Sequence, residues 1–186
     1  GTLRGASAMR AGGHAYRMYG VQNMYGGRVR AEVVVIGTGA GGAVVARELA
    51  AKGRDVVLVE EGAWYDRRHF NRRPFEMSRL MYRDLAMTMT LGRVAIVVPL
   101  GKTVGGPTTI NSGTCFRAPP PVLAQWVREG LDLTVERLAP HYQKIEDFLG
   151  VTEVPEELLG KNACLVRAGA EKLGMTARPL RRNAPA

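Results

Sequence analysis

The chain has 186 residues and carries 26 Lys and Arg against 17 Asp and Glu, which gives a net charge of +9. Hydrophobic residues make up 46% of it, enough for a core, which excludes a wholly disordered chain. No apolar run approaches the roughly 20 residues that a membrane-spanning helix requires, so we predict no integral membrane segment. Cys115 and Cys164 have neither metal-site nor disulfide spacing, which favours a reducing, cytoplasmic location.

Arginine supplies much of the positive charge and gathers in two stretches, residues 4–30 and residues 67–83. The second stretch is interleaved with aromatic residues, a composition that nucleic-acid sites also use. No nucleic-acid-binding motif accompanies it. We therefore interpret the charge as solvated surface around a site for an anionic cofactor, with no nucleic-acid partner. Residues 1–29 show no hydrophobic period, which predicts an irregular basic extension.

Residues 31–60 have the pattern of a strand, a glycine turn, a helix and a second strand. The first predicted strand, residues 32–36, runs into the turn Gly37-Thr-Gly-Ala-Gly-Gly42. The helix predicted for residues 41–52 ends before Gly53, a natural left-handed cap, and the second strand, residues 55–60, ends in an acid. This order and spacing are typical of a dinucleotide-binding unit, and they predict an α/β, Rossmann-like fold.

The glycines of this first motif and the acid after it have separate structural roles. Gly37 allows the tight turn, Gly39 lets the backbone approach a pyrophosphate, and Gly42 lets the helix pack closely on the strand. The helix N-terminus presents N–H groups to the phosphates. Glu60 stands where a carboxylate accepts hydrogen bonds from an adenosine ribose. Glu61 follows it instead of an arginine, so NADP is disfavoured on charge, and NAD and FAD both stay open.

A second glycine motif occupies residues 100–111. It follows residues 94–98, whose apolar run predicts a short buried strand. Pro107 suits the first turn of a helix, so Gly105 and Gly106 come directly before a helix N-terminus, beside two threonine hydroxyls. Backbone donors at such a place can bind an anion or the polar edge of a ring. A glycine-rich hairpin without a ligand is the alternative interpretation.

Helical spacing dominates the remaining segments. Residues 75–85 have a helical pattern, a second helix is predicted to begin at Pro140, and a third to run over residues 155–174. Only two strands of a parallel sheet can be identified with their neighbours, so the Rossmann-like domain is predicted to be incomplete.

These observations divide the chain into three parts. The basic extension covers residues 1–29, the N-terminal part of the cofactor domain covers residues 30–118, and residues 119–186 form a helical segment that leads into a second domain.

The two glycine motifs together resemble the glucose–methanol–choline (GMC) family of FAD-dependent alcohol oxidoreductases. The family has the same strand-turn-helix, then a ribose-binding Glu followed closely by Gly, here Glu60 and Gly62. Its second signature, G-[KR]-x-[LV]-G-G-[ST]-[ST]-x-x-N, matches Gly101 to Asn111 except for Pro107 at the first hydroxyl position. The segments around Trp126 and over residues 138–146 are also similar. Phe116-Arg-Ala-Pro119 is most similar to the bacterial long-chain-alcohol-oxidase-like branch.

This resemblance implies FAD as the cofactor and suggests which residues hold it. The first motif would bind the pyrophosphate through Gly37, Gly39, Ala40, Gly41 and Gly42, and Glu60 would bind the adenosine ribose. The residues expected along the flavin are Gly105, Gly106, Thr108, Thr109 and Asn111. Some members attach FAD through a histidine before the motif Asn. This chain has Ile110 there, so its FAD should be dissociable.

The resemblance gives no catalytic residue within the chain. His14, His69 and His141 are its only histidines, and none falls in the family's catalytic motif, which lies near the far C-terminus. We therefore expect an inactive N-terminal fragment of a protein about three times longer, judged by the usual size of two-domain enzymes. The full enzyme would oxidise the CH–OH group of a small-molecule alcohol by hydride transfer to flavin.

Two alternatives stay open at this stage. One is a fragment of a nicotinamide-dependent dehydrogenase, which the second glycine motif disfavours. The other is a non-catalytic, truncated nucleotide-binding module, since an incomplete sheet exposes its edge and one apolar face. The substrate alcohol, the electron acceptor and the oligomeric state are also left open.

Overall fold

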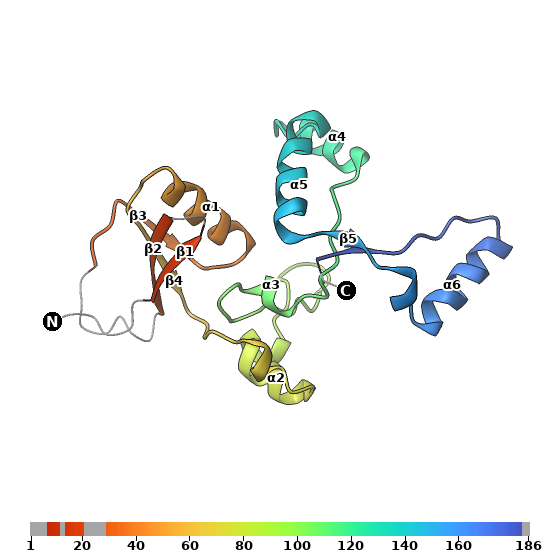
Figure 1. Cartoon of the computed structure of the whole chain (residues 1–186), viewed down its shortest axis with the longest axis horizontal. Helices are drawn as coiled ribbons and strands as arrows, with labels where there is room; N and C mark the ends of the chain where they lie inside the picture. Colours follow the sequence, from red (N-terminus) through yellow and green to blue (C-terminus); the bar gives the residue numbers. More distant parts are fainter. Residues whose placement is uncertain (1–6, 12–13, 21–28, 184–186) are drawn as a thin grey trace. The chain divides into compact units, whose positions relative to one another are not determined.

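A computed structural model describes residues 7–11, 14–20 and 29–183 (Figure 1). The chain divides into two compact units, Gly1–Asn111 and Ser112–Ala186. The division falls directly after the last residue of the second glycine motif. Each motif residue assigned to the cofactor therefore belongs to the first unit.

A four-stranded sheet in the order β1-β2-β4-β3 forms the centre of the first unit. β3 and β2 both pair with β4 in parallel, with Val33 opposite Val56 and Gly20 opposite Glu60. The carboxyl ends of three parallel strands therefore meet at one edge, where Glu60 lies, and ligands bind at this edge in such sheets. The strands are β1 (Ser7–Ala11), β2 (His14–Gly20), β3 (Val33–Ile36) and β4 (Val56–Glu60).

The N-terminal hairpin corrects a prediction from the sequence. β1 and β2 pair antiparallel within the stretch predicted to be irregular, and β2 continues the sheet along the edge of β4. Backbone pairing with β4 orders this segment, because an unpaired edge leaves N–H and C=O groups without partners. A hydrophobic period is not needed for that pairing. The rest of the stretch, residues 1–6, 12–13 and 21–28, lies outside the described residues.

Helix α1 (Ala40–Ala51) covers one face of the sheet through small side chains. Ala46 and Ala50 pack with Val56 and Leu58 in the buried core of the unit. The strand-turn-helix-strand order predicted for residues 31–60 is confirmed. The left-handed Gly53 (φ +78°) that ends the helix is confirmed as well.

Two other predictions for the first unit were wrong. The helix predicted for residues 75–85 ends earlier: α2 (Pro74–Met81) stops where Tyr82 adopts an extended backbone. Asp84, Leu85 and Ala86 then take positive φ in the short 3-10 segment η3 (Arg83–Ala86), which a helix cannot continue through. Residues 94–98 form no buried strand. They are exposed and pair with residues 88–90: Val97 bridges to Met89, the N–H of Val98 donates to Thr88 O (2.8 Å), and the N–H of Thr90 donates to Ile96 O (2.9 Å). Their apolar run therefore does not indicate burial.

The described part of the second unit contains three longer helices and a short antiparallel pair of strands. β5 pairs with β6, and Thr114 bridges to Arg182 on β6. The elements are α4 (Pro120–Arg128), α5 (Val135–Leu149), β5 (Thr152–Glu153), the 3-10 segment η4 (Glu156–Leu158), α6 (Lys161–Lys172) and β6 (Arg181–Arg182).

Both helices predicted here begin elsewhere. α5 starts five residues before Pro140, because the Thr134 side chain caps it by accepting a hydrogen bond from the Arg137 N–H (3.3 Å). Pro140 lies inside the helix, so proline did not mark its start. The helix predicted for residues 155–174 is divided into η4 and α6, with Gly160 at the N-cap of α6.

Among the residues that the structure describes, no helix has both the length and the apolar character that crossing a bilayer requires. The same residues contain no group of three or more His, Cys, Asp or Glu side chains that could hold a metal ion.

Candidate cofactor site

The carboxylate of Glu60 lies at the end of β4 and is buried, with 6% of the residue exposed. Its Oε2 accepts hydrogen bonds from the N–H (2.8 Å) and the hydroxyl (2.5 Å) of Thr38, and its Oε1 accepts one from the N–H of Gly62 (2.8 Å). A carboxylate has about four acceptor positions. Three are occupied by protein donors, which leaves one, on Oε1, for an external hydroxyl.

Thr38 joins the two glycine motifs. It is buried (3% exposed), and its hydroxyl accepts a hydrogen bond from the N–H of Gly105 (2.8 Å) while donating to Glu60. A chain of hydrogen bonds therefore runs from the second motif through the first motif to the acid of β4. The sequence analysis missed this residue, because its position in the motif tolerates many residue types and its partner lies 67 positions away.

Close backbone contacts bring the same segments together. A Cβ at Gly106 would lie 3.4 Å from the Cα of Gly39. A Cβ at Gly62 would lie only 2.2 Å from the backbone N of Thr103, so the segment after β4 and the second motif approach at a distance that excludes any side chain. The N–H of Val104 donates to the carbonyl of Ala63 (3.0 Å) and continues this pairing.

In the first glycine motif the N–H groups of Gly37 and Thr38 are bonded, to Val59 O (2.7 Å) and to Glu60 Oε2 (2.8 Å), whereas those at the start of α1 are free among the described residues. The hydrogen bonds of α1 begin at Ala43, whose N–H donates to Gly39 O (2.9 Å). Four preceding N–H groups have no acceptor among the described residues, as expected for the first turn of a helix. They point to a place where an anion can be bound by backbone donors and the helix dipole. They belong to Gly39, Ala40, Gly41 and Gly42.

The second glycine motif, in contrast, satisfies its own donors. The N–H of Gly106 donates to Thr103 O (2.8 Å), and those of Thr108 and Thr109 donate to Gly105 O (3.1 Å) and Gly106 O (3.2 Å). Both threonine hydroxyls also donate to backbone carbonyls. The helix there, α3 (Pro107–Ile110), has only four residues. A ligand beside this motif would therefore meet the lone pairs of hydroxyls rather than the N–H groups that we predicted.

Glu61 changes the charge argument about NADP. Its carboxylate forms an ion pair with Arg83, so it does not stand as a second free negative charge beside Glu60. Discrimination against a 2′-phosphate then rests on Glu60 alone. Arg83 was grouped with solvated surface in the sequence, because its partner lies 22 positions away.

None of the three histidines was predicted to be catalytic. Two of them have described side chains: His69 accepts and shares hydrogen bonds with Asp66 in a capping box of the short segment η2 (Arg67–His69), and His141 is exposed on α5. The ring of Tyr65 meets that of His69 edge to face. His69 therefore has a local structural role.

The parallel sheet, the glycine turn with free helix N–H groups and the acid at the end of β4 define a dinucleotide-binding protein of Rossmann type. The profile of the GMC oxidoreductase family matches residues 31–186, and the chain belongs to this family. The family is FAD-dependent in general, and the resemblance that the two glycine motifs predicted is confirmed.

Several curated relatives are similar to the chain. An uncharacterised GMC-type oxidoreductase of Mycobacterium tuberculosis is 44% identical over 159 residues, 84% of this chain and 25% of the relative. Another, of Sinorhizobium fredii, is 32% identical over 158 residues, 84% of this chain and 31% of the relative. A long-chain-alcohol oxidase of Arabidopsis thaliana is 33% identical over 161 residues, 84% of this chain and 21% of the relative. The chain thus spans about a quarter of the length of these relatives.

Proposed function

We propose that this chain is the FAD-binding N-terminal portion of an oxidoreductase that oxidises the CH–OH group of an alcohol by hydride transfer to flavin. The observation that carries the proposal is the bond between Thr38 and Gly105, which joins the two glycine motifs into one site. NAD and FAD share the adenosine diphosphate half that the first motif would hold, so the second motif beside it, which is part of the GMC signature, is what favours FAD. The relatives named as long-chain-alcohol oxidases support an alcohol as the substrate class.

The residues present fit the adenosine and pyrophosphate parts of FAD. Four free N–H groups at the start of α1 suit the pyrophosphate, and the remaining acceptor position on Glu60 suits one ribose hydroxyl. A side chain at Gly39 would occupy the space that the pyrophosphate needs. When bound, FAD supplies the hydride acceptor. The residues of this chain hold and orient it. Ile110 offers no group for covalent attachment, so we propose that FAD is dissociable.

The site residues have separate proposed roles. The first motif and Glu60 bind the adenosine diphosphate half. The threonine hydroxyls and Asn111 face the flavin half. We propose no catalytic base within this chain and expect the chain alone to be inactive. A cytoplasmic location is proposed on the basis of the free thiols of Cys115 and Cys164.

A binding titration tests the cofactor. The full-length protein, stripped of flavin, is titrated with FAD and separately with NAD, beside the variants Gly39→Ala and Gly169→Ala. Gly169 lies on α6, and a Cβ there meets nothing within 4 Å, so it controls for a glycine-to-alanine change outside the site. We expect FAD binding that Gly39→Ala weakens and Gly169→Ala leaves unchanged. Binding of NAD in preference to FAD would instead support the nicotinamide-dependent dehydrogenase.

A second measurement tests the reaction. Addition of a long-chain primary alcohol to the FAD-loaded protein without oxygen should bleach the visible flavin absorbance. An alcohol deuterated at the carbinol carbon should slow this bleaching, because the C–H bond breaks in a hydride transfer. FAD binding without bleaching by any alcohol would confine the proposal to flavin binding.

A further inference from the structure

A cavity of about 350 Å³ lies within the second unit, beside helix α6. Three parts of the chain line it: the segment between β5 and α6, one face of α6, and the return segment, by which we mean residues 175–182. Most of its lining side chains are aliphatic, among them Leu159, Val166 and Leu180. Sites for small molecules have volumes of roughly 300–1,000 Å³ and similarly apolar walls.

Backbone hydrogen bonds hold the walls of this cavity in place. Gly174, with φ +68°, reverses the chain after α6, and the N–H of Met175 donates back to Ala170 O (2.9 Å). The return segment then runs to β5, where the N–H of Val154 donates to Leu180 O (3.1 Å) and β6 pairs with β5. The cavity is therefore formed by the fold of the second unit itself.

The aliphatic wall is in contact with solvent. Val166 on α6 is 69% exposed, and Leu180 on the return segment is 50% exposed. Covering such side chains with another apolar group is favourable, because it removes apolar surface from water. An aliphatic chain is therefore the kind of ligand that this wall suits.

The charge of the lining is positive, because three arginines and no acid belong to its described residues. Arg167 is neutralised by Glu156, whose two carboxylate oxygens lie 2.7 and 2.8 Å from Nη1. Arg178 has no hydrogen-bond or ion-pair partner among the described residues. Arg182 donates from Nη2 to Ser112 O (2.5 Å), but its buried Nε has no acceptor there. Two guanidinium groups thus keep unused donors, and a buried donor without an acceptor is rare in proteins.

We propose that this cavity binds an unbranched aliphatic carboxylate of medium length. The chain of the ligand lies against the aliphatic wall, and its carboxylate accepts hydrogen bonds from Arg178 and from the Nε–H of Arg182. Guanidinium groups bind carboxylates through charge-assisted hydrogen bonds, and the lining offers no competing acid. None of these residues belongs to the proposed FAD site, so the inference goes beyond the proposed function and does not depend on it.

The competing occupant is another part of the same protein. The Mycobacterium tuberculosis relative is matched over only 25% of its length, so a full-length protein of this kind has further chain that could cover an apolar wall. The experiment therefore uses the full-length, FAD-loaded protein.

Isothermal titration calorimetry with octanoate, decanoate and the uncharged octanamide tests the site. Ala163→Leu places a larger side chain in the cavity wall, and Ala168→Leu makes the same change on α6 at an exposed residue outside the lining. Arg178→Gln removes one positive charge from the cavity. Arg128→Gln does the same at an exposed residue of α4 that does not line it.

We expect decanoate to bind about tenfold more tightly than octanoate, because each buried CH₂ contributes about fourfold to affinity. Ala163→Leu should raise the octanoate dissociation constant at least about tenfold, since it fills the space of the chain. Arg178→Gln should raise it about fivefold and leave the weaker binding of octanamide unchanged. Ala168→Leu and Arg128→Gln should bind octanoate as the wild type does.

Three results would overturn the inference. Unchanged octanoate binding by Ala163→Leu would place the ligand outside this cavity. Equal binding of octanamide and octanoate, with no effect of Arg178→Gln, would exclude a carboxylate site. If the wild type binds no octanoate, the inference fails as well, and a lower thermal midpoint of Ala163→Leu would then identify another part of the protein as the occupant. A failure to bind FAD would count against the proposed function alone.

Discussion

The two glycine motifs both lead into a helix, but they differ in what they offer a ligand. The first leaves four N–H groups at the start of α1 without an acceptor among the described residues, whereas the second binds its own N–H groups to its own carbonyls and to Thr38. A glycine motif can thus present free N–H donors to a ligand, or it can form a tight turn whose N–H groups are bonded within the protein. The hydrogen-bond partners reveal this difference, because both motifs place a glycine at the N-cap of a helix, Gly39 before α1 and Gly106 before α3.

The largest effect is expected where the first motif needs close packing. A Cβ at Gly42 would lie 2.0 Å from the carbonyl oxygen of Gly37, a backbone atom that cannot move aside. Gly42→Ala should therefore destabilise the first unit by about 3 kcal/mol or more. Urea unfolding of the purified protein measures it. A cost below about 1 kcal/mol would show that α1 does not pack on the turn as described.

Gly39→Ala separates donor function from folding in the same motif. A Cβ there meets only the Pro107 side chain at 3.9 Å, an ordinary contact, and the backbone φ of −63° suits any residue. Stability should stay within about 0.5 kcal/mol of the wild type. FAD affinity should fall at least about tenfold, or about 1.4 kcal/mol, in an equilibrium titration. Unchanged affinity would mean that the free N–H groups are not the phosphate site.

Thr38→Val tests the bond between the motifs. Valine keeps the shape of threonine but leaves the Gly105 N–H without its acceptor and removes one donor from Glu60. The cost should be about 1–3 kcal/mol of folding stability, with weaker FAD binding. Thr88→Val, at an exposed hydroxyl that donates to Val98 O, is the matched control and should have little effect. If the two variants lose the same stability and FAD affinity, the hydrogen bond between Thr38 and Gly105 does not hold the two motifs together.

Thr108→Ala should have a smaller effect, because the exposed Thr108 hydroxyl donates one hydrogen bond, to Gly105 O (2.6 Å). Its removal should cost about 0.5–1.5 kcal/mol. If this hydroxyl also faces the flavin, the visible absorption of bound FAD should shift as well. A loss of stability without any shift of the flavin absorption would mean that the Thr108 hydroxyl only stabilises the turn and does not face the flavin.

The smallest effect is expected at an ion pair that neither motif uses. Arg54 and Glu32 form an exposed pair near the starts of β4 and β3, at the end of the sheet opposite the site. Glu32→Gln should change stability by less than about 1 kcal/mol and leave FAD binding unchanged. Calorimetry and the same titration check both. A clear loss of FAD affinity would show that the whole sheet, not its carboxyl edge, determines binding.

The local part of this arrangement could be predicted from the sequence. The unit from β3 to β4, the turn glycines and the place of Glu60 at the end of the second strand follow from patterns that span fewer than 30 residues. The short helix after Gly106 was predicted by Pro107 in the same way. Residues close together in the sequence determine these elements, so the elements can be predicted from one sequence.

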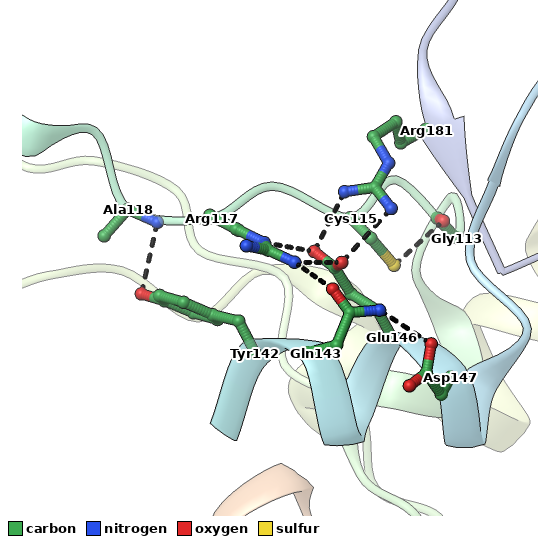
Figure 2. A network of polar contacts seen from close by, with 9 residues as sticks. All are labelled: Gly113, Cys115, Arg117, Ala118, Tyr142, Gln143, Glu146, Asp147 and Arg181. Atoms are coloured by element: carbon green, nitrogen blue, oxygen red, sulfur yellow. Dashed lines mark hydrogen bonds and ion pairs between the residues drawn. The ribbon is translucent and has the colours of Figure 1, made fainter. Parts of the chain in front are cut away.

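The parts that the sequence did not reveal depend on distant partners. The role of Thr38 requires Gly105, and the neutralised charge of Glu61 requires Arg83. The buried carboxylate of Glu146 likewise requires Arg117 and Arg181, 29 and 35 positions away (Figure 2). The apolar run of residues 94–98 was predicted to be buried, but no element of the described chain covers it. The type of a side chain does not by itself predict which distant residue will contact it.

The strand order has a consequence for how the first unit is made. β2 comes before β3 in the chain, yet it lies on the far side of β4, so its partner is the last of the four strands to be synthesised. On a ribosome, the hairpin of β1 and β2 must wait until the chain has passed residue 60 before it can take its place. Contacts over such separations form slowly, because loop closure costs entropy before the pairing compensates it. We therefore expect the nascent chain to assemble from β3, α1 and β4 outward, with the hairpin of β1 and β2 joining last.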